Sequence, residues 1–166
     1  MRAPFAFFVC LMLLPGLAGC GLQPMYAGGA RGEVAQGLGA IEVPAIEGQA
    51  GWLMRNALND RLDAKPDMPA RYRLDVRLDD QLEGLGILGN DNVGRERRIL
   101  RARYQLVDLT DDTILLDATS GSDAGIDVVS SEYATIAAEQ TALENLAREV
   151  ADRIVTQIAL TLRSSE

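Results

Sequence analysis

The sequence contains no histidine among its 166 residues. This absence excludes catalytic triads with histidine, HExxH zinc sites and a histidine general base that works near neutral pH. Carboxylate pairs such as Asp79-Asp80 and Asp111-Asp112 remain, but adjacent acids at strand ends and turns are typical of solvated turns. We therefore expect a protein that is not an enzyme and that holds neither a metal nor another cofactor.

Cysteine and long apolar runs are also scarce. The chain has two cysteines, Cys10 and Cys20. The apolar run from Ala3 to Pro15 is shorter than the ~20 residues that cross a bilayer as a helix. Because this run follows one basic residue, Arg2, and leads to a pair of small residues, it has the pattern of an export signal.

The end of this segment, Leu17-Ala18-Gly19-Cys20, resembles the lipobox of bacterial lipoproteins. The resemblance implies that residues 1–19 are a signal peptide, that cleavage precedes Cys20, and that acyl chains such as palmitate modify the thiol and the new amino group. Several chains would form a durable anchor, because each buried methylene contributes about 0.8 kcal/mol. The alternative is an ordinary signal peptide that is followed by a cysteine by chance.

Cleavage would leave 147 residues without a free thiol, so packing alone must hold the exported chain together. A chain of this length buries roughly two-thirds of its unfolded surface, which supports one hydrophobic core. We expect one domain over residues 40–166, joined to Cys20 by a flexible linker over residues 20–39 that is rich in glycine. Loss of Arg2 leaves 15 basic against 24 acidic residues, and this balance disfavours nucleic acid as a partner.

Three segments follow the linker. The apolar residues between Ile41 and Ile46 predict a short strand, and Pro44 places it at a sheet edge or a bulge. A stripe at four-residue spacing predicts a helix over residues 51–62. Strict alternation of apolar and charged residues over 72–79 predicts a strand with one buried face.

The next segment, residues 84–89, matches the G-x-G-x-x-G pattern of dinucleotide-binding loops. That motif requires a helix to open within it, whereas residues 90–94 here are typical of a turn. We interpret the segment as a mobile loop whose three aliphatic residues contact a partner, although it could fold back on its own core. These three residues are Leu85, Ile87 and Leu88.

Two further strands, over residues 95–109 and 113–127, are predicted to form a hairpin. A three-residue loop over residues 110–112 sets Leu106 opposite Leu116 and Tyr104 opposite Ala118, so that apolar residues share one face. A two-residue loop would instead place Leu106 against Asp117, at a cost of several kcal/mol. We therefore predict the three-residue loop.

The hairpin separates charge. Five arginines fall within residues 95–103, whereas residues 108–127 contain six aspartates and no basic residue. One interpretation is that the two strands neutralise each other across a solvated face. The other is that Arg97, Arg101 and Arg103, which share one face by alternation, present their guanidinium groups to phosphate or carboxylate.

A long amphipathic helix is predicted over residues 132–163, with Ser130 and Ser131 as candidate caps. Its apolar stripe runs from Ile136 to Leu162 in steps of three or four residues. A helix of this length spans about 45 Å, which is longer than a four-stranded sheet requires. We therefore expect one end to overhang and to be available to a partner.

Two segments resemble the LptE family, the lipoprotein partner of the outer-membrane lipopolysaccharide translocon. One is the start of the mature chain, and the other opens the last helix: Cys20-Gly21-Leu22-Gln23-Pro24-Met25-Tyr26 and Ser131-Glu132-Tyr133-Ala134. The order of predicted elements is also similar. The resemblance implies an α+β two-layer sandwich, in the order β-α-β-β-β-α, with two helices on a four-stranded mixed sheet.

The same resemblance implies a function that is not enzymatic. The domain would be anchored on the periplasmic side of the outer membrane, would plug the LptD β-barrel and assist its assembly, and would bind lipopolysaccharide. Gly21, rather than aspartate, after Cys20 fits sorting to the outer membrane. No short motif transfers the family's lipopolysaccharide contacts, so Arg97, Arg101 and Arg103 are chosen on charge alone. The alternative function is a generic lipoprotein scaffold that binds periplasmic protein or peptidoglycan.

Overall fold

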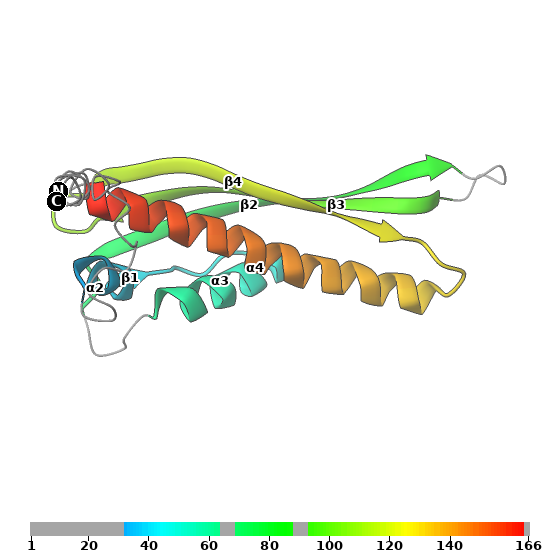
Figure 1. The fold of residues 1–166 in the computed structure, drawn as a ribbon, viewed down its shortest axis with the longest axis horizontal. Coiled ribbons are helices and arrows are strands. Elements are labelled where there is room, and N and C mark those ends of the chain that lie inside the picture. The colour runs from blue at the N-terminus through cyan, green and yellow to red at the C-terminus, as the bar shows by residue number, and fades with distance from the viewer. Residues whose placement is uncertain (1–31, 64–68, 88–92, 165–166) are drawn as a thin grey trace, which may run out of the picture.

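The structure, a computed structural model, describes residues 32–63, 69–87 and 93–164. In chain order its elements are α2 (Glu33–Gly39), β1 (Ile41–Glu42), α3 (Gly48–Leu62), β2 (Tyr72–Ile87), β3 (Val93–Asp108), β4 (Thr113–Asp127) and α4 (Glu132–Ser164) (Figure 1). The sheet order is β1-β2-β3-β4, in which β1 runs parallel to β2 and the other neighbours are antiparallel. The predicted α+β class and mixed sheet are confirmed, with three described helices instead of two.

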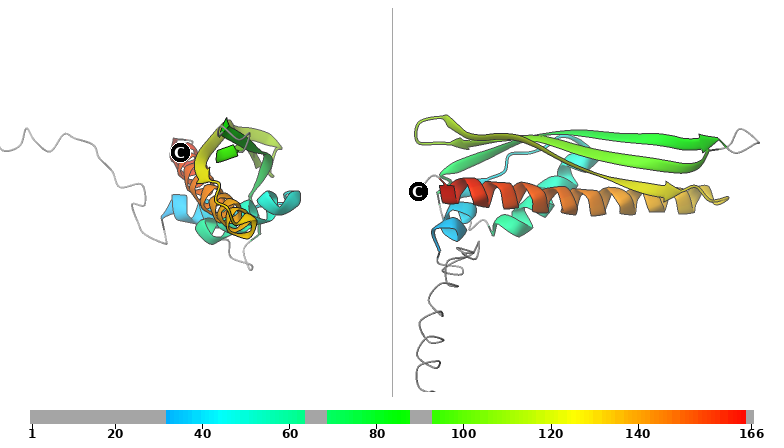
Figure 2. Two further views of the ribbon diagram at one scale, coloured as in Figure 1. Left: turned by 90° about the vertical axis from the view of Figure 1, so that its right-hand side faces the viewer. Right: turned by 45° about the horizontal axis from the view of Figure 1, so that its top comes forward.

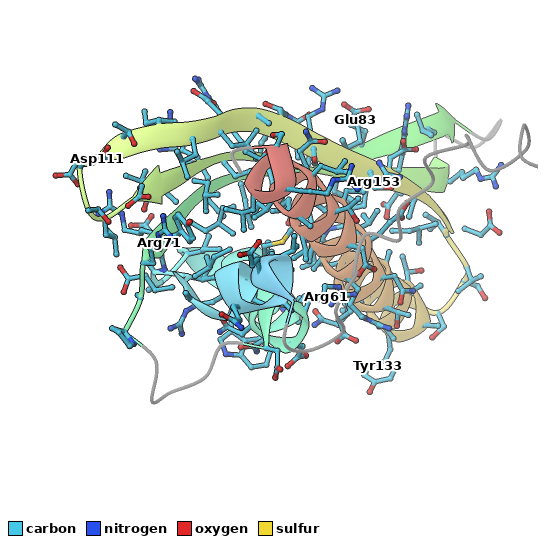
Figure 3. The ribbon with its side chains drawn as sticks, turned by 60° about the vertical axis from the view of Figure 1, so that its left-hand side comes forward. Arg61, Arg71, Glu83, Asp111, Tyr133 and Arg153 are labelled. Carbon is cyan, nitrogen blue, oxygen red and sulfur yellow. The ribbon has the colours of Figure 1, made fainter. Side chains whose placement is uncertain are left out.

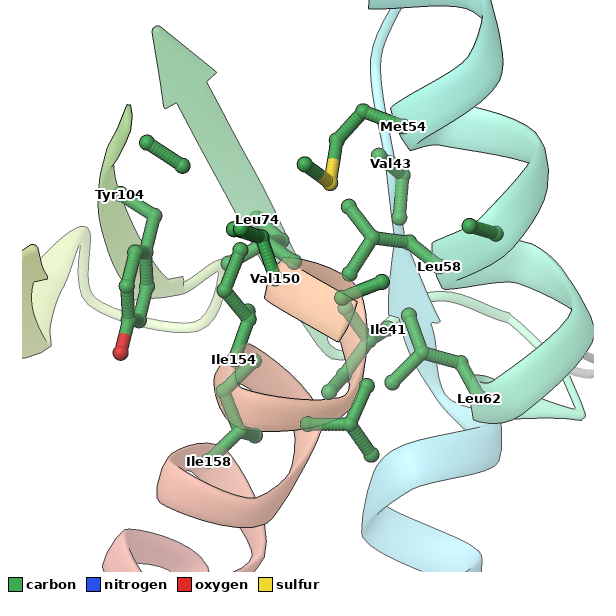
Figure 4. Close-up of a cluster of buried hydrophobic side chains, with 14 of the residues drawn as sticks. Ile41, Val43, Met54, Leu58, Leu62, Leu74, Tyr104, Val150, Ile154 and Ile158 are labelled. Atoms are coloured by element: carbon green, nitrogen blue, oxygen red, sulfur yellow. The ribbon is translucent and has the colours of Figure 1, made fainter. Parts of the chain in front are cut away.

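The core lies between the sheet and the long helices, which cover the same face of the sheet (Figure 2). Alternate residues of β2 and β3 point toward this face, and those in residues 72–74 and 100–106 are buried, as the predicted period of two requires. The buried stripes of α3 and α4 meet them (Figure 4). The residues that are fully buried include Met54, Leu58, Leu74, Leu100, Leu106, Val150, Ile154 and Ile158.

Helices α3 and α4 lie side by side and run in the same direction. The side chain of Gln49 donates to that of Gln140 over 2.7 Å at the start of α3. At its end, Arg61 contacts Asp152 through two hydrogen bonds, of which the Nη2 to Oδ2 bond measures 2.9 Å. Helix α4 therefore extends beyond α3 at its N-terminal end.

The linker prediction differs from the structure over residues 33–39, which form helix α2. Leu38 of this helix is buried, and α2 packs near the C-terminal end of α4. A Cβ atom at Gly37 would lie 3.1 Å from Leu162 Cδ1, so this glycine permits a close approach between helices. Residues 20–31 of the predicted linker lie outside the described residues.

The predicted β3–β4 register is confirmed, because Leu106 pairs with Leu116 and Tyr104 with Ala118. The predicted three-residue loop is wrong, because Asp108 pairs with Thr113 and leaves four residues between the strands. A β-bulge beyond Leu106 accommodates one extra residue and restores the register.

Strand β2 is longer than predicted and includes most of the glycine-rich segment. Gly84 pairs with Glu96, Leu85 with Arg95, and Ile87 with Val93. Residues 84–87 therefore belong to a strand, not to a loop, because β3 supplies hydrogen-bonding partners along their length. Strand β1 is short and lies at the edge of the sheet, as predicted.

Helix α4 begins within one residue of the predicted cap. The Ser131 hydroxyl accepts a hydrogen bond from the Ala134 backbone N–H over 3.4 Å. The predicted buried stripe is wrong at Ile136, which is 55% exposed, whereas Thr135 is buried. Tyr133 is 84% exposed and points away from the body of the molecule (Figure 3).

Candidate functional site: the outer face of the sheet

The candidate site is the outer face of the sheet, which is the face turned away from α3 and α4. The predicted residues Arg97, Arg101 and Arg103 all lie on this face of β3, because they alternate with the buried residues Leu100 and Ala102. The structure therefore brings the three predicted arginines together in one row. All three side chains are exposed.

Two of the three arginines have carboxylate partners on β4. Arg97 Nε donates to Asp123 Oδ2 over 3.0 Å, and Arg103 Nη2 donates to Asp117 Oδ2 over 3.1 Å. These hydrogen bonds lower the pKa values of Asp123 and Asp117, the latter with help from Gln105. The sequence interpretation of cross-strand neutralisation thus holds at these two positions, although exposed pairs of this kind contribute little to stability.

Arg101 differs from its two neighbours. It pairs with Asp79 of β2 and Gly121 of β4 in the register, and its side chain has no ion pair or hydrogen bond within the described part of the chain. A Cβ atom at Gly121 would lie only 3.0 Å from Arg101 Cγ, so the glycine provides room for the arginine stem. A depression of about 360 Å³ surrounds this position, lined by Arg97, Arg101 and residues 119–123.

Arg77 is a cationic residue that sequence reasoning missed. It lies on the outer face of β2 directly opposite Arg103, and it has no carboxylate partner in the residues described. The two arginines line a depression of about 410 Å³ that also contacts residues 44–46. The β2–β3 register would have revealed the pair, but the sequence alone did not establish that register.

Arg98 lies on the opposite, inner face and has a structural role. Its Nη2 and Nε atoms donate to Asp80 over 2.6 and 2.9 Å, and its Nη1 atom donates to the Glu139 backbone carbonyl over 3.2 Å. Both charged side chains are mostly buried, at 16% and 24% exposure. Arg98 therefore connects two strands to the N-terminal part of α4.

The other predicted site residues lie partly outside the described structure. Leu85 is in β2 and is 39% exposed, and its predicted contact with a partner stays a prediction. The backbone of Ile87 ends β2, while Leu88 and the predicted lipidation residue Cys20 lie outside the described residues. The described end of β2 and the start of α4 lie at the end of the molecule opposite α2 (Figure 1).

The family model described as LptE: Lipopolysaccharide-assembly matches residues 38–158. The chain belongs to the LptE family. The match extends from the last turn of α2 into the last turns of α4, and so includes the whole sheet and the arginine row. Membership of the LptE family supports a role in lipopolysaccharide assembly. No curated protein sequence matches the chain.

Solved structures agree with the LptE assignment. A lipoprotein from Caulobacter crescentus CB15 is similar at 28% identity, with a TM-score of 0.67 over 78% of this chain and 96% of that one. Rare lipoprotein B from Shewanella oneidensis is 15% identical, with a TM-score of 0.52 over 73% of this chain and 92% of that one. A minor lipoprotein from Acinetobacter baumannii is 17% identical, with a TM-score of 0.56 over 72% of this chain and 88% of that one. The last two likenesses show a shared fold.

Among the described residues, no helix is long and apolar enough to span a membrane. Helix α4 has the length, but charged residues interrupt it between Glu132 and Arg153 and again at Arg163.

Proposed function

We propose that this protein is a lipoprotein of the outer membrane that assembles lipopolysaccharide at the cell surface together with the LptD β-barrel. In this proposal it plugs the barrel, assists barrel assembly and binds lipopolysaccharide, without catalysing a reaction. The observation that carries the proposal is the LptE family match across residues 38–158. The similarity to known lipoproteins supports a membrane-associated role.

The proposed anchor is Cys20, which stands thirteen residues before α2 begins. Acyl chains on Cys20 would hold the end of the domain that carries α2 close to the periplasmic surface of the outer membrane. The opposite end, with Leu85 and the start of α4, would then face away from the anchor and toward the barrel. Exposed aliphatic and aromatic residues at that end fit a protein partner.

The proposed lipopolysaccharide contact is the arginine row. The body of the protein is acidic, with a net charge of −8, so a phosphate must be met locally by a cationic group. The Arg101 guanidinium makes no ion pair or hydrogen bond within the described structure, and we propose it as the first contact. Arg97 and Arg103 would join it by exchanging Asp123 and Asp117 for phosphate oxygens.

Purification of the native lipoprotein in detergent tests the proposed partner. We expect a β-barrel protein to co-purify in a 1:1 ratio, identified by mass spectrometry, because a plug has one binding place per barrel. A matched purification of the same chain with Cys20→Ala should lose the lipid and with it most of the barrel. Recovery of the intact lipoprotein without any barrel would favour the generic scaffold and would contradict the proposal.

A further inference from the structure

Strand β4 is the last strand of the sheet, so one of its edges is open. The Val128 N–H donates to the Gly94 carbonyl of β3, and even-numbered residues of β4 continue this ladder. Backbone groups alternate in direction along a strand, so the N–H and C=O groups of Asp123, Gly125 and Asp127 point to the open edge. No other strand of the described structure pairs with this edge. Such an edge presents backbone donors and acceptors that a further strand can use.

Arg153 of α4 confirms this direction and limits the open edge. Its Nη1 atom donates to the carbonyl of Gly121, which lies two residues before Asp123 and therefore points to the same side. Its Nη2 atom donates to Glu149 over 2.5 Å, which holds the guanidinium in place. Arg153 thus occupies the edge at Gly121. The part of the edge beyond it, over residues 123–127, has no such cover in the described structure.

A groove of about 600 Å³ lies between this part of β4 and the first half of α4, which are close together in Figure 1. Its floor is apolar and buried, and its helix wall carries short, exposed side chains. The floor includes Ile126, Ala142 and Leu146, and the wall includes Ala137, Ala138, Thr141 and Asn145. The open backbone groups of β4 therefore lie beside a space that long side chains do not fill.

The open backbone groups favour a peptide over a lipid chain as the occupant of the groove. An acyl chain would take water away from the N–H and C=O groups of residues 123, 125 and 127 without replacing their hydrogen bonds, which is unfavourable. An extended peptide would replace them with about six backbone hydrogen bonds, two for each of these residues.

The charges of the groove indicate the side chains of that peptide. Its lining contains three acidic residues, Asp123, Asp127 and Glu149, and no basic residue. Arg97 and Arg95 contact the two aspartates from β3, on the side away from the groove, and leave them 49% and 79% exposed. A basic side chain on a strand beside β4 would therefore be attracted to each aspartate.

Gly125 lies between the two aspartates on the same face of β4 and leaves that face bare. A Cβ atom at Gly125 would meet only the Arg95 side chain, at 3.7 Å, so the backbone there is open to a neighbouring strand. Large apolar side chains on an adjacent strand cover such glycines at a sheet edge. The facing residue should therefore be large and apolar.

We propose that an extended segment of the barrel partner joins the sheet as a fifth strand, along residues 123–127 of β4. The segment carries basic residues opposite Asp123 and Asp127 and a large apolar residue opposite Gly125. The residues between them are small and face Ala142 and Leu146. This inference rests on the proposed function, since it names a contact that holds the barrel partner, and one segment for each copy preserves the 1:1 ratio.

Hydrogen exchange at residue resolution tests the pairing, on the detergent-purified complex and on the full-length lipoprotein expressed without the barrel. The amides of Asp123, Gly125 and Asp127 should exchange about tenfold more slowly in the complex, because they become hydrogen-bonded. The amides of Ser122 and Ala124, which face β3 in both samples, are internal controls. Unchanged exchange in a complex that contains the barrel overturns the pairing and leaves the proposed function intact. Absence of the barrel overturns both.

Two variants of β4 separate the backbone contact from the shape of the edge. Gly125→Pro removes an open N–H group that the ladder to β3 does not use, so the fold should persist and the amides of Ser122 and Ala124 should stay slow. In its complex, the slowing at Asp123 and Asp127 should fall to about twofold or less. Gly125→Ala keeps the N–H group and should behave as the wild type. Full slowing in Gly125→Pro would contradict the pairing.

A variant of α4 tests the same groove without a change in the strand. Thr141→Arg places a long side chain among the groove carboxylates and should reduce the slowing as Gly125→Pro does, because it fills the space of the added strand. Thr156→Arg is the matched control, since this exposed residue of α4 does not line the groove. Equal slowing in the complexes of both variants would overturn the proposed position of the segment.

Addition of purified lipopolysaccharide to the lipoprotein without the barrel tests the competing occupant. We expect the amides of Asp123, Gly125 and Asp127 to stay as fast as in the lipoprotein alone. Slow exchange of these amides under lipopolysaccharide would assign the groove to acyl chains and would overturn the pairing.

Discussion

The two halves of the sandwich are held together by different forces. The packed half consists of residues 33–62, 72–79, 100–122 and 140–164, and the distal half of residues 80–87, 93–99 and 123–139. In the packed half, apolar side chains from three helices and the sheet fill the interior. In the distal half only α4 covers the sheet, and the inner face carries the charged residues Asp80, Arg98 and Glu96.

This difference suits the packed half to stabilising the fold and the distal half to contacting a partner. Apolar burial contributes most of the folding free energy, so the packed half should unfold last. The distal half depends on hydrogen bonds, one mostly buried ion pair and a single helix, and it exposes Leu82, Leu85 and Ile136. A region of low local stability with exposed apolar residues is suited to rearrangement against a partner. Four predictions test this contrast, from the largest effect to the smallest.

Truncation of isoleucines in the same helix should give very different losses in the two halves. Ile154→Ala in the packed half removes a fully buried side chain and should lower the free energy of unfolding by about 3 kcal/mol. Ile136→Ala in the distal half should cost less than about 0.5 kcal/mol, since the side chain is largely exposed. Chemical denaturation measures both values. Equal losses would contradict the division into halves.

Removal of the Arg98 charge should loosen the distal half selectively. Arg98→Met leaves Asp80 mostly buried without its partner and breaks the contact to the Glu139 carbonyl. We expect a loss of about 1–3 kcal/mol. Hydrogen exchange should accelerate in residues 80–87 and 93–99 but not in residues 100–108. Uniform acceleration along β3 would show that the two halves unfold as one unit.

Glu96 should make the distal half sensitive to pH. Its Oε2 atom is buried without a hydrogen-bond partner in the described structure, and burial together with Glu139 raises its pKa. The folded state therefore binds this proton more tightly than the unfolded state, and stability falls as pH rises from the ordinary glutamate value of about 4.3 through the raised value.

Glu96→Gln removes this cost. At neutral pH the variant should gain about 0.5–1 kcal/mol over the wild type, as judged by the melting temperature. Below about pH 4 both proteins carry a neutral side chain here, and the gain should vanish. A constant difference at all pH values would mean that the glutamate charge is not responsible.

The arginine row should affect binding more than folding. Changing Arg97, Arg101 and Arg103 together to serine should reduce lipopolysaccharide binding several-fold, while the melting temperature stays within a few degrees, because the ion pairs are exposed. Arg101→Ser alone should account for most of the loss. Arg95→Ser on the same strand is the matched control. Unchanged binding in the triple variant would leave cross-strand neutralisation as the role of the row.

Much of the fold follows from local periodicity. Alternation in residues 72–79 and 102–106 predicts both the strands and the buried face, because one face is apolar and the other is charged. The β3–β4 pairs at Tyr104 and Leu106 follow from the same pattern. The bulge beyond Leu106 does not, because an inserted residue leaves no mark in the alternation before it. The loop length was therefore wrong although the register was right.

The remaining differences depend on contacts between distant residues. The glycine content around Gly37 predicts a linker, yet Gly37 belongs to α2. Helix α2 packs against the distant residue Leu162, and this contact leaves no mark in the local sequence. Ile136 continues the periodic stripe of α4. The stripe does not reveal that α3 begins beside Gln140 and leaves Ile136 exposed. For the candidate site, the shared face of the three arginines follows from alternation. Their partners do not, since Asp117 and Asp123 are chosen by the geometry of a neighbouring strand.

Helix α4 lies in both halves, and its 33 residues include neither glycine nor proline. Such a helix resists bending, because it offers no site where its hydrogen-bond ladder is interrupted. If a partner tilted the exposed first turn of α4 at Tyr133, the whole helix would therefore tilt with it, including its C-terminal end. There Leu162 lies close to α2, which is the first described element after the proposed lipid anchor at Cys20. A force applied at one end of the molecule would thus reach the end that lies nearest the proposed anchor.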